Sequence, residues 1–165
     1  MEMRLRNASN QDAQEATSFI ERILSVYGLS MDLEGQDSDL RDIEATYFAA
    51  GGSFEILEDA AGKIIGMVAV RPKDRITCEL RRLYLAPNLR GKGLGARLLQ
   101  HALVNARRSG FMKMELVTAT ALKEAINLYA RFGFQPANAV CGSCCDRAFS
   151  LDLTKLNPDS MSTYF

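Results

Sequence analysis

The feature that most constrains the fold is a strand-like run that leads directly into a glycine-rich segment and an amphipathic helix. The run from Glu79 to Leu85 meets a Pro-Asn turn, and Arg90-Gly91-Lys92-Gly93-Leu94-Gly95 then opens the helix. Glycines let the backbone curl so that successive N–H groups converge, and a helix N-terminus adds partial positive charge. With the charges of Arg90 and Lys92 beside it, this segment is typical of a phosphate or pyrophosphate site.

Hydrophobic periodicity predicts the elements around this segment. A strand and two helices are expected first, then three antiparallel strands joined by short turns, and after the glycine-rich segment a helix, a strand, a helix and a last strand. The expected strands cover 3–6, 54–57, 63–70, 76–85, 112–116 and 148–153, and the expected helices cover 19–27, 38–50, 94–109 and 122–132.

The strand, helix and strand from residue 79 to 116 imply a right-handed crossover and a parallel strand pair. Helices before, within and after the strand series can cover both faces of the sheet. The sequence therefore predicts an α/β (α+β) fold with a mixed, mostly antiparallel central sheet. We expect a single domain over residues 3–153, followed by a C-terminal tail over 154–165.

Composition limits the classes of partner. The 165 residues are 47% hydrophobic, enough for one domain that buries roughly 70% of its unfolded surface. Twenty basic residues balance twenty acidic ones, so we expect no nucleic-acid partner and expect Arg81 and Arg82 to be solvated. The longest apolar run, Ile64 to Val70, is too short to span a bilayer, and the N-terminus lacks a signal-peptide pattern. We expect a soluble, cytoplasmic protein that is not associated with membranes.

The cysteines do not form a metal-binding pattern. Cys141 and Cys144 have zinc-knuckle spacing, but there is no second pair, and the only histidine, His101, lies in a helix elsewhere. We therefore expect no metal and reduced cysteines. His101 itself is expected at the surface or at the edge of the core.

Two motifs resemble those of one enzyme superfamily. Arg90-x-x-Gly93-x-Gly95, between a strand and a helix, resembles the pyrophosphate loop of the GNAT superfamily of acetyl-CoA-dependent N-acetyltransferases. The segment from Ala125 to Phe134, Ala-Ile-Asn-Leu-Tyr-Ala-Arg-Phe-Gly-Phe, resembles a helix of the same superfamily. The order of elements also fits from about residue 3 to 153, so the resemblance covers nearly the whole chain.

The resemblance implies a donor site for acetyl-CoA where the parallel strands splay apart. The main chain at Leu83 and Leu85 would pair with the pantetheine arm as an added strand does. The pyrophosphate would be held by Arg90, Gly91, Lys92, Gly93, Leu94, Gly95 and Ala96. Many members carry an asparagine for the pantetheine where this chain has Leu122, so that contact is either absent or made by Asn127 or the backbone.

The implied reaction is direct attack of a primary amine on the thioester in a ternary complex, without a metal. Glu79 is the candidate base, although a carboxylate near its ordinary pKa of about 4.3 is a weak base for a lysine-like amine near 10.4. Burial, a bridging water or a weakly basic amine would close that gap. The alternative for Glu79 is an ion pair with Arg81 or a neighbouring strand.

Tyr129 is the candidate acid. A phenol is a weaker acid than a thiol, so hydrogen bonding to the leaving thiolate is favoured over complete proton transfer. The alternative is a core residue, because Tyr129 lies on the apolar stripe of its helix. Tyr84 is expected on the strand face opposite Leu83 and Leu85, in the core.

Two segments are candidates for the acceptor site by analogy with the family. The acidic segment Asp32–Asp39 either attracts a cationic amine or is a solvated loop. The loop Cys141–Asp146 would form the opposite wall. The expected acceptor is a small-molecule or peptide amine, and polyamine, amino acid, antibiotic and protein amine all remain open. The same analogy with the family suggests a homodimer.

Two other functions compete with the enzyme. A non-catalytic acyl-CoA-binding or sensor module would keep the glycine-rich loop but tolerate loss of Glu79 and Tyr129. A nucleotide-phosphate binder is disfavoured because the loop lacks the Gly-Lys-Ser/Thr ending of a P-loop.

Overall fold

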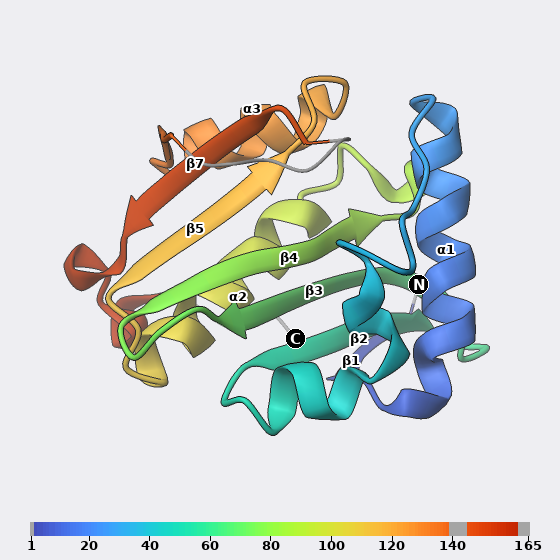
Figure 1. The fold of residues 1–165 in the computed structure, drawn as a ribbon, viewed down its shortest axis with the longest axis horizontal. Coiled ribbons are helices and arrows are strands. Elements are labelled where there is room, and N and C mark those ends of the chain that lie inside the picture. The colour runs from blue at the N-terminus through green and yellow to red at the C-terminus, as the bar shows by residue number, and fades with distance from the viewer. Residues whose placement is uncertain (1, 139–144, 162–165) are drawn as a thin grey trace.

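The protein folds around one mixed sheet, seen in a computed structural model that describes residues 2–138 and 145–161 (Figure 1). The spatial order is β1-β2-β3-β4-β5-β7-β6, and every neighbouring pair is antiparallel except β4 and β5. The strands are β1 Met3–Asn7, β2 Ser53–Asp59, β3 Ile64–Pro72, β4 Thr77–Leu85, β5 Lys113–Thr118, β6 Gln135–Pro136 and β7 Arg147–Asp152. The predicted mixed, mostly antiparallel sheet is confirmed; the two-residue β6 was not predicted.

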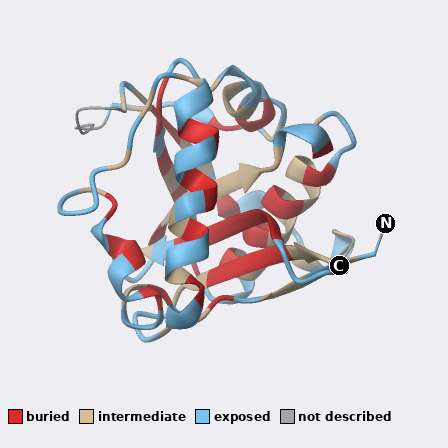
Figure 2. Ribbon diagram, turned by 90° about the vertical axis from the view of Figure 1, so that its right-hand side faces the viewer, coloured by how far each residue is buried: buried red, intermediate tan, exposed pale blue. Residues whose placement is uncertain are grey.

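Helices cover both faces of this sheet. The helix α1 (Ala13–Val26) packs on one face, and α2 (Leu94–Arg108) and α3 (Lys123–Arg131) pack on the other. In Figure 2 the side of the molecule that carries α1 faces the viewer, and buried and exposed residues alternate along the helix as its amphipathic sequence predicts. Short turns complete the fold: η1 Asn10–Asp12, η2 Ser38–Arg41, η3 Glu44–Phe48, η4 Pro87–Leu89, η5 Leu153–Lys155 and η6 Pro158–Ser160.

Two hydrophobic cores lie on opposite faces of the sheet. Ile65, Val68 and Val70 of β3 contribute to the core under α2, whereas Ile64, Met67 and Ala69 contribute to the core under α1. A strand in the middle of a sheet that is covered on both faces must be apolar on both faces. This explains why the run from Ile64 to Val70 is continuously hydrophobic, and every one of its residues is buried.

The parallel pair separates after three residues. Thr77, Cys78 and Glu79 of β4 pair with Lys113, Met114 and Glu115 of β5, and no later residue of either strand continues that pairing among the described residues. Because β4 runs on to Leu85 and β5 to Thr118, the two strands diverge beyond Glu79. The predicted splayed parallel pair is therefore confirmed.

A bulge changes the facing of side chains along β4. Ala69 of β3 lies opposite Arg81, but Met67 lies opposite Tyr84, so β4 has one extra residue there. Arg82 lies in this bulge with φ 57°, the one positive φ outside glycine among the described residues. Beyond the bulge, Leu83 and Leu85 contact the core under α2 and Tyr84 contacts the core under α1, so Tyr84 lies on the face opposite the two leucines, as predicted.

One predicted helix differs from the structure. No continuous helix covers 38–50: a 3₁₀ turn (η2) is followed by a π-helical turn (η3), and neither has a side-chain cap. The apolar residues Leu40, Ile43 and Tyr47 are buried as predicted. Within the described part of the expected tail, η6 contacts α2 and Leu156 packs against the core under α2.

Candidate active site

The glycine-rich segment lines a cavity of about 320 Å³, which we call the glycine-loop cavity. Its walls come from the end of β4, the loop, the first turn of α2, α3 and the end of α1. Of the residues predicted to bind a cofactor, those lining it are Leu83, Leu85, Arg90, Gly91, Gly93, Gly95 and Ala96. Lys92 is exposed and does not line the cavity, and the Leu94 side chain is buried in the core, so only the main chain of Leu94 can serve a ligand there.

The backbone of the loop requires glycine at two positions. Gly91 has φ 76° and Gly93 has φ 80°, both in the left-handed region that other residues avoid. Gly93 is the N-cap of α2 and has no side chain to accept from the helix amides. The first-turn N–H groups therefore remain open towards a ligand, where the helix dipole favours an anion.

The position of Arg90 is set by contacts from two other helices. Its Nη1 donates to the Tyr27 hydroxyl at 2.7 Å, and that hydroxyl donates to Glu124 Oε2 at 3.0 Å. Tyr27 ends α1 and Glu124 lies in the first turn of α3, so three segments meet at the mouth of the cavity. Sequence analysis missed both residues, and no local pattern marks them.

Burial and the neighbouring Glu124 raise the pKa of Tyr27, although Arg90 opposes the shift. The hydroxyl therefore stays protonated at neutral pH and can bridge the two charged side chains. Arg131, on α3, also lines this cavity and adds a second cation.

The outer edge of β4 is open beside this cavity. Beyond Glu79, β4 has no strand partner on the β5 side among the described residues, so its main chain can bond to something else. Leu122 and Ala125 face this opening from the α3 side. Asn127 is exposed and lines neither this cavity nor the next, so it does not replace the missing asparagine side chain.

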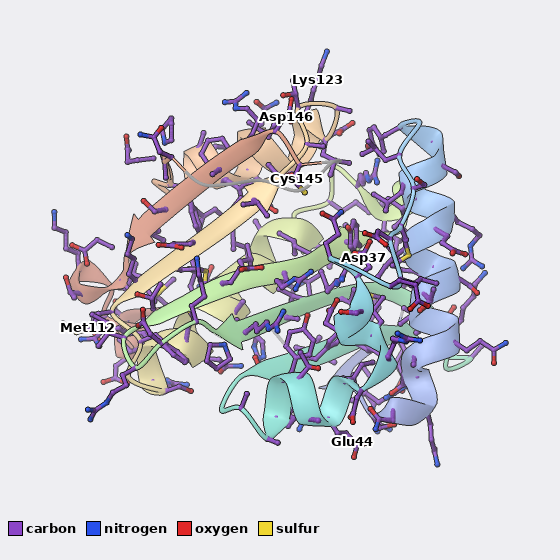
Figure 3. The ribbon with its side chains drawn as sticks, in the orientation of Figure 1. Asp37, Glu44, Met112, Lys123, Cys145 and Asp146 are labelled. Carbon is purple, nitrogen blue, oxygen red and sulfur yellow. The ribbon has the colours of Figure 1, made fainter. Side chains whose placement is uncertain are left out.

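A second cavity of about 350 Å³ adjoins the first, and we call it the Glu79 cavity. The two share Leu83, Tyr84, Leu122 and Ala125 as lining residues. Glu79 and Tyr129, the two residues predicted to be catalytic, both line the Glu79 cavity. Asp37 and Cys145, labelled in Figure 3, reach it from the segments before η2 and before β7.

Glu79 is half-buried and forms an ion pair. Its Oε1 lies 3.3 Å from Arg81 Nε, and its side chain is 24% exposed. The ion pair that the sequence left as an alternative is therefore present. It does not remove the carboxylate from the cavity, because Glu79 and Arg81 both line it.

Tyr129 is a core residue that also reaches the Glu79 cavity. It is 6% exposed, and its ring packs against Phe134 and Phe149 at centroid distances of 5.6 and 6.3 Å. Burial, with a smaller contribution from Tyr84, raises the pKa of Tyr129 well above its usual range. The phenol therefore stays protonated, which suits a hydrogen-bond donor better than a group that gives up its proton.

The expectation that Arg82 is solvated was wrong. Arg82 is 7% exposed and donates to the carboxylates of Asp37 and Asp39, and the Asp39 carboxylate also accepts from Tyr47. Arg81 is held too, donating to the Gln36 carbonyl at 2.7 Å. Two adjacent arginines interrupting an apolar alternation were the available signal of a bulge. The side chains of Arg82, Asp37, Asp39 and Tyr47 form what we call the Arg82 network.

The Arg82 network also changes the interpretation of the acidic segment. Burial would raise the pKa of Asp39, but hydrogen bonds and charge from Arg82 outweigh it and hold that pKa below its usual range. Asp37 and Asp39 are thus neutralised internally and do not attract a cationic acceptor. Asp32 and Glu34 remain exposed, and Glu34 pairs with Arg41.

Cys78 and His101 are separate from this site. Cys78 is buried, and burial raises the pKa of its thiol to about 12, so it is unreactive. His101 is half-buried against Glu55 on the far side of α2, and the part of the chain that the structure describes contains no metal-binding group of side chains. Cys141 and Cys144 lie outside the described residues. No helix in 2–138 or 145–161 has the length and hydrophobicity to cross a membrane.

Known proteins of similar sequence are N-acetyltransferases. Residues 19–134 match the acetyltransferase (GNAT) family. The chain is 31% identical over 143 residues to the Escherichia coli uncharacterized N-acetyltransferase YjgM, covering 84% of this chain and 85% of the relative. It is 33% identical over 121 residues to rat N-acetyltransferase family 8 member 2, covering 70% of this chain and 53% of that protein.

Solved structures share the fold. A Staphylococcus aureus GNAT-family acetyltransferase superposes with a TM-score of 0.87 at 19% identity, covering 93% of this chain and all of that one. A phosphinothricin acetyltransferase from Sinorhizobium meliloti, solved in complex with acetyl-CoA, superposes with a TM-score of 0.70 at 22% identity, covering 96% and 94%. With two motifs, a splayed parallel pair and these relatives in agreement, the chain belongs to the GNAT family of N-acetyltransferases and is an acyltransferase.

Proposed function

We propose that this protein transfers an acetyl group from acetyl-CoA to a primary amine by direct attack in a ternary complex. The observation that carries the proposal is the junction of two cavities at Leu83, Tyr84, Leu122 and Ala125. A donor held in the glycine-loop cavity and an acceptor held in the Glu79 cavity would meet there, beside the bulge of β4. Proximity of two bound reactants is a large part of catalysis for such a transfer.

The described residues fit the donor. Open amides at Gly91, Gly93 and the first turn of α2, with Arg90 and Arg131, suit a pyrophosphate. The unpaired edge of β4 at Leu83 and Leu85 suits the amide-bearing pantetheine arm. Two neighbours of the same fold were solved with acetyl-CoA, the phosphinothricin acetyltransferase and a putative acetyltransferase from Salmonella typhimurium, which supports the same co-substrate here.

The acceptor must lose two protons to become a neutral amide. We assign Glu79, directly or through a water, to accept the proton of the ammonium form. The nitrogen lone pair then attacks the thioester carbonyl carbon and the carbon–sulfur bond breaks, with its electron pair going to sulfur. A second proton from the nitrogen balances the thiolate, so the products are the acetylated amine, CoA thiol and one released proton.

Tyr129 is assigned to the leaving sulfur. Its buried hydroxyl remains protonated and can donate a hydrogen bond as negative charge develops on the thiolate. A backbone N–H near the β4 bulge would serve the carbonyl oxygen in the same way. Neither role requires a metal or a covalent enzyme intermediate.

Acetyl transfer is tested by incubating the protein with acetyl-CoA and a broad amine panel, reading CoA release together with the gain of one acetyl mass on the amine. We expect Glu79→Gln to lower kcat/KM by about 10²- to 10⁴-fold, as loss of a general base does. Tyr129→Phe should lower kcat by about 10- to 100-fold, because a hydrogen bond to a charged group is lost.

Binding must be measured separately from turnover. Both variants should bind acetyl-CoA in calorimetry as the wild type does, since Glu79 and Tyr129 line the other cavity. Binding by the wild type with no turnover on any amine would instead favour an acyl-CoA sensor. Absence of binding would overturn the donor site itself.

A further inference from the structure

One arginine in the Glu79 cavity has no carboxylate partner. The charged residues that line this cavity are Asp37, Arg71, Glu79, Arg81 and Arg82. Arg82 is paired with Asp37 and Asp39, and Arg81 with Glu79 and Asp39. The Arg71 side chain is exposed and forms no ion pair or hydrogen bond with any of the described residues, so its charge is open to the cavity.

Arg71 lies directly across from the proposed base. In the antiparallel pairing of β3 with β4, Arg71 is the partner of Glu79, so both side chains project from the same face of the sheet. No ion pair joins the two side chains. A molecule whose amine reaches Glu79 therefore has beside it an exposed guanidinium that can bind an anion.

The balance of charge in the Glu79 cavity restricts the chemical class of the acceptor. The Glu79 cavity is lined by three guanidinium groups and two carboxylates, one of which, Asp37, is already neutralised by Arg82. A polyamine would bring further positive charge next to Arg71 and Arg81, which is unfavourable. A lysine side chain on a protein surface would bring no anion for Arg71. An amine with a carboxylate close by supplies both charges.

Resting on the proposed acetyl transfer, we propose that the acceptor is a small amino acid-like molecule, whose amine faces Glu79 and whose carboxylate binds Arg71. The planar guanidinium can bind a carboxylate through two parallel hydrogen bonds, which fixes the orientation of the acceptor as well as its charge. The cavity of about 350 Å³ has room for a molecule of this size beside the donor thioester.

The test compares acceptors that differ only in the carboxylate. L-amino acids, their primary amides and the corresponding decarboxylated amines are assayed with acetyl-CoA, and kcat/KM is measured for each. We expect acids to exceed their amides by about 10- to 100-fold, the range for a charge-assisted hydrogen bond. In Arg71→Gln the acid-to-amide ratio should fall towards one, through the KM of the acid, and Arg71→Lys should restore part of it.

A matched control is Arg75→Gln, which removes an exposed arginine of the β3–β4 turn that lines neither cavity. It should keep the wild-type ratio, which separates binding at Arg71 from a general loss of positive charge. Amides acetylated as well as acids, or a ratio unchanged in Arg71→Gln, would overturn the inference while acetyl transfer itself stands. No acetylation of any acceptor would overturn both.

Discussion

The two cavities of this enzyme adjoin but are built differently. In the glycine-loop cavity, most of the groups that suit the donor are main-chain groups: those of the glycines at positive φ, the first turn of α2 and the open edge of β4. The Glu79 cavity is formed by side chains, and its wall depends on a buried cluster that joins residues more than forty positions apart in the chain. A short motif can encode the first kind of site, whereas the second needs the whole fold.

The two cavities also differ in the electrostatic cost of folding them. Main-chain amides at a helix start carry no desolvated full charge, so the glycine-loop cavity adds little electrostatic cost. Arg82, Asp37 and Asp39 are all buried, and each loses the solvation of a full charge. Such a cluster contributes only while every partner is present, because removing one leaves an uncompensated buried charge.

Among substitutions that test this difference between the cavities, the largest effect on stability is expected from Arg82→Met. The substitution leaves the carboxylates of Asp37 and Asp39 without their main partner, and we expect the free energy of unfolding to fall by about 3–5 kcal/mol. Urea unfolding at neutral pH measures it. Because the network supports the Glu79 cavity, the KM for the acceptor should rise more than the KM for acetyl-CoA.

The pH dependence of the stability lost in Arg82→Met is the control for this prediction. The pKa of Asp39 is held below its usual range in the folded protein, so its stabilisation is present above about pH 4 and is lost as the pH falls through the folded value. The difference in the free energy of unfolding between the wild type and Arg82→Met should therefore decrease at acidic pH. If that difference stays constant from neutral pH to pH 3, the destabilisation does not come from loss of the ion pairs.

A smaller effect is expected from Gly93→Ala, which tests the main-chain cavity. The added Cβ would meet nothing within 4 Å, so the cost comes from the positive φ alone, about 1–2 kcal/mol. We expect the Kd for acetyl-CoA in calorimetry to rise by about 5- to 30-fold as the amides turn away from the ligand.

Gly62→Ala is the matched control for this substitution. Gly62 has φ 81° in the β2–β3 turn, with nothing within 4 Å of an added Cβ, and it lines neither cavity. It should lower the melting temperature and leave the donor Kd unchanged. Equal loss of donor affinity in both variants would mean that general destabilisation, not the loop geometry, weakens binding.

The smallest effect is expected from Tyr27→Phe. The substitution removes the hydroxyl that accepts from Arg90 and donates to Glu124, and keeps the ring beneath the guanidinium, 5.7 Å from its centre. The KM for acetyl-CoA should rise by about 2- to 10-fold at constant kcat, which steady-state kinetics at saturating acceptor would show. An unchanged KM would mean that Arg90 does not need this support.

Local patterns in the sequence predicted much of the fold. The alternating apolar residues of β5 and the helical stripe of α2 were predicted correctly because each of these elements buries one repeating face. The segment over 38–50 was predicted as one helix, but it forms two short turns, and its Asp39 carboxylate is paired with Arg82 of β4. The effect of a charge more than forty positions away cannot be judged from neighbouring residues alone.

By itself, the sequence determined the glycine loop, the strand before it and the helix after it, because backbone conformation there depends on adjacent residue types. Only the tertiary structure decided that Arg82 is buried, that Tyr27 holds Arg90 and that Arg71 lies across from Glu79 with no ion-pair partner in 2–138 or 145–161. The physical reason is that these contacts join separate elements, and the pairing of charges depends on which side chains the sheet brings to one face.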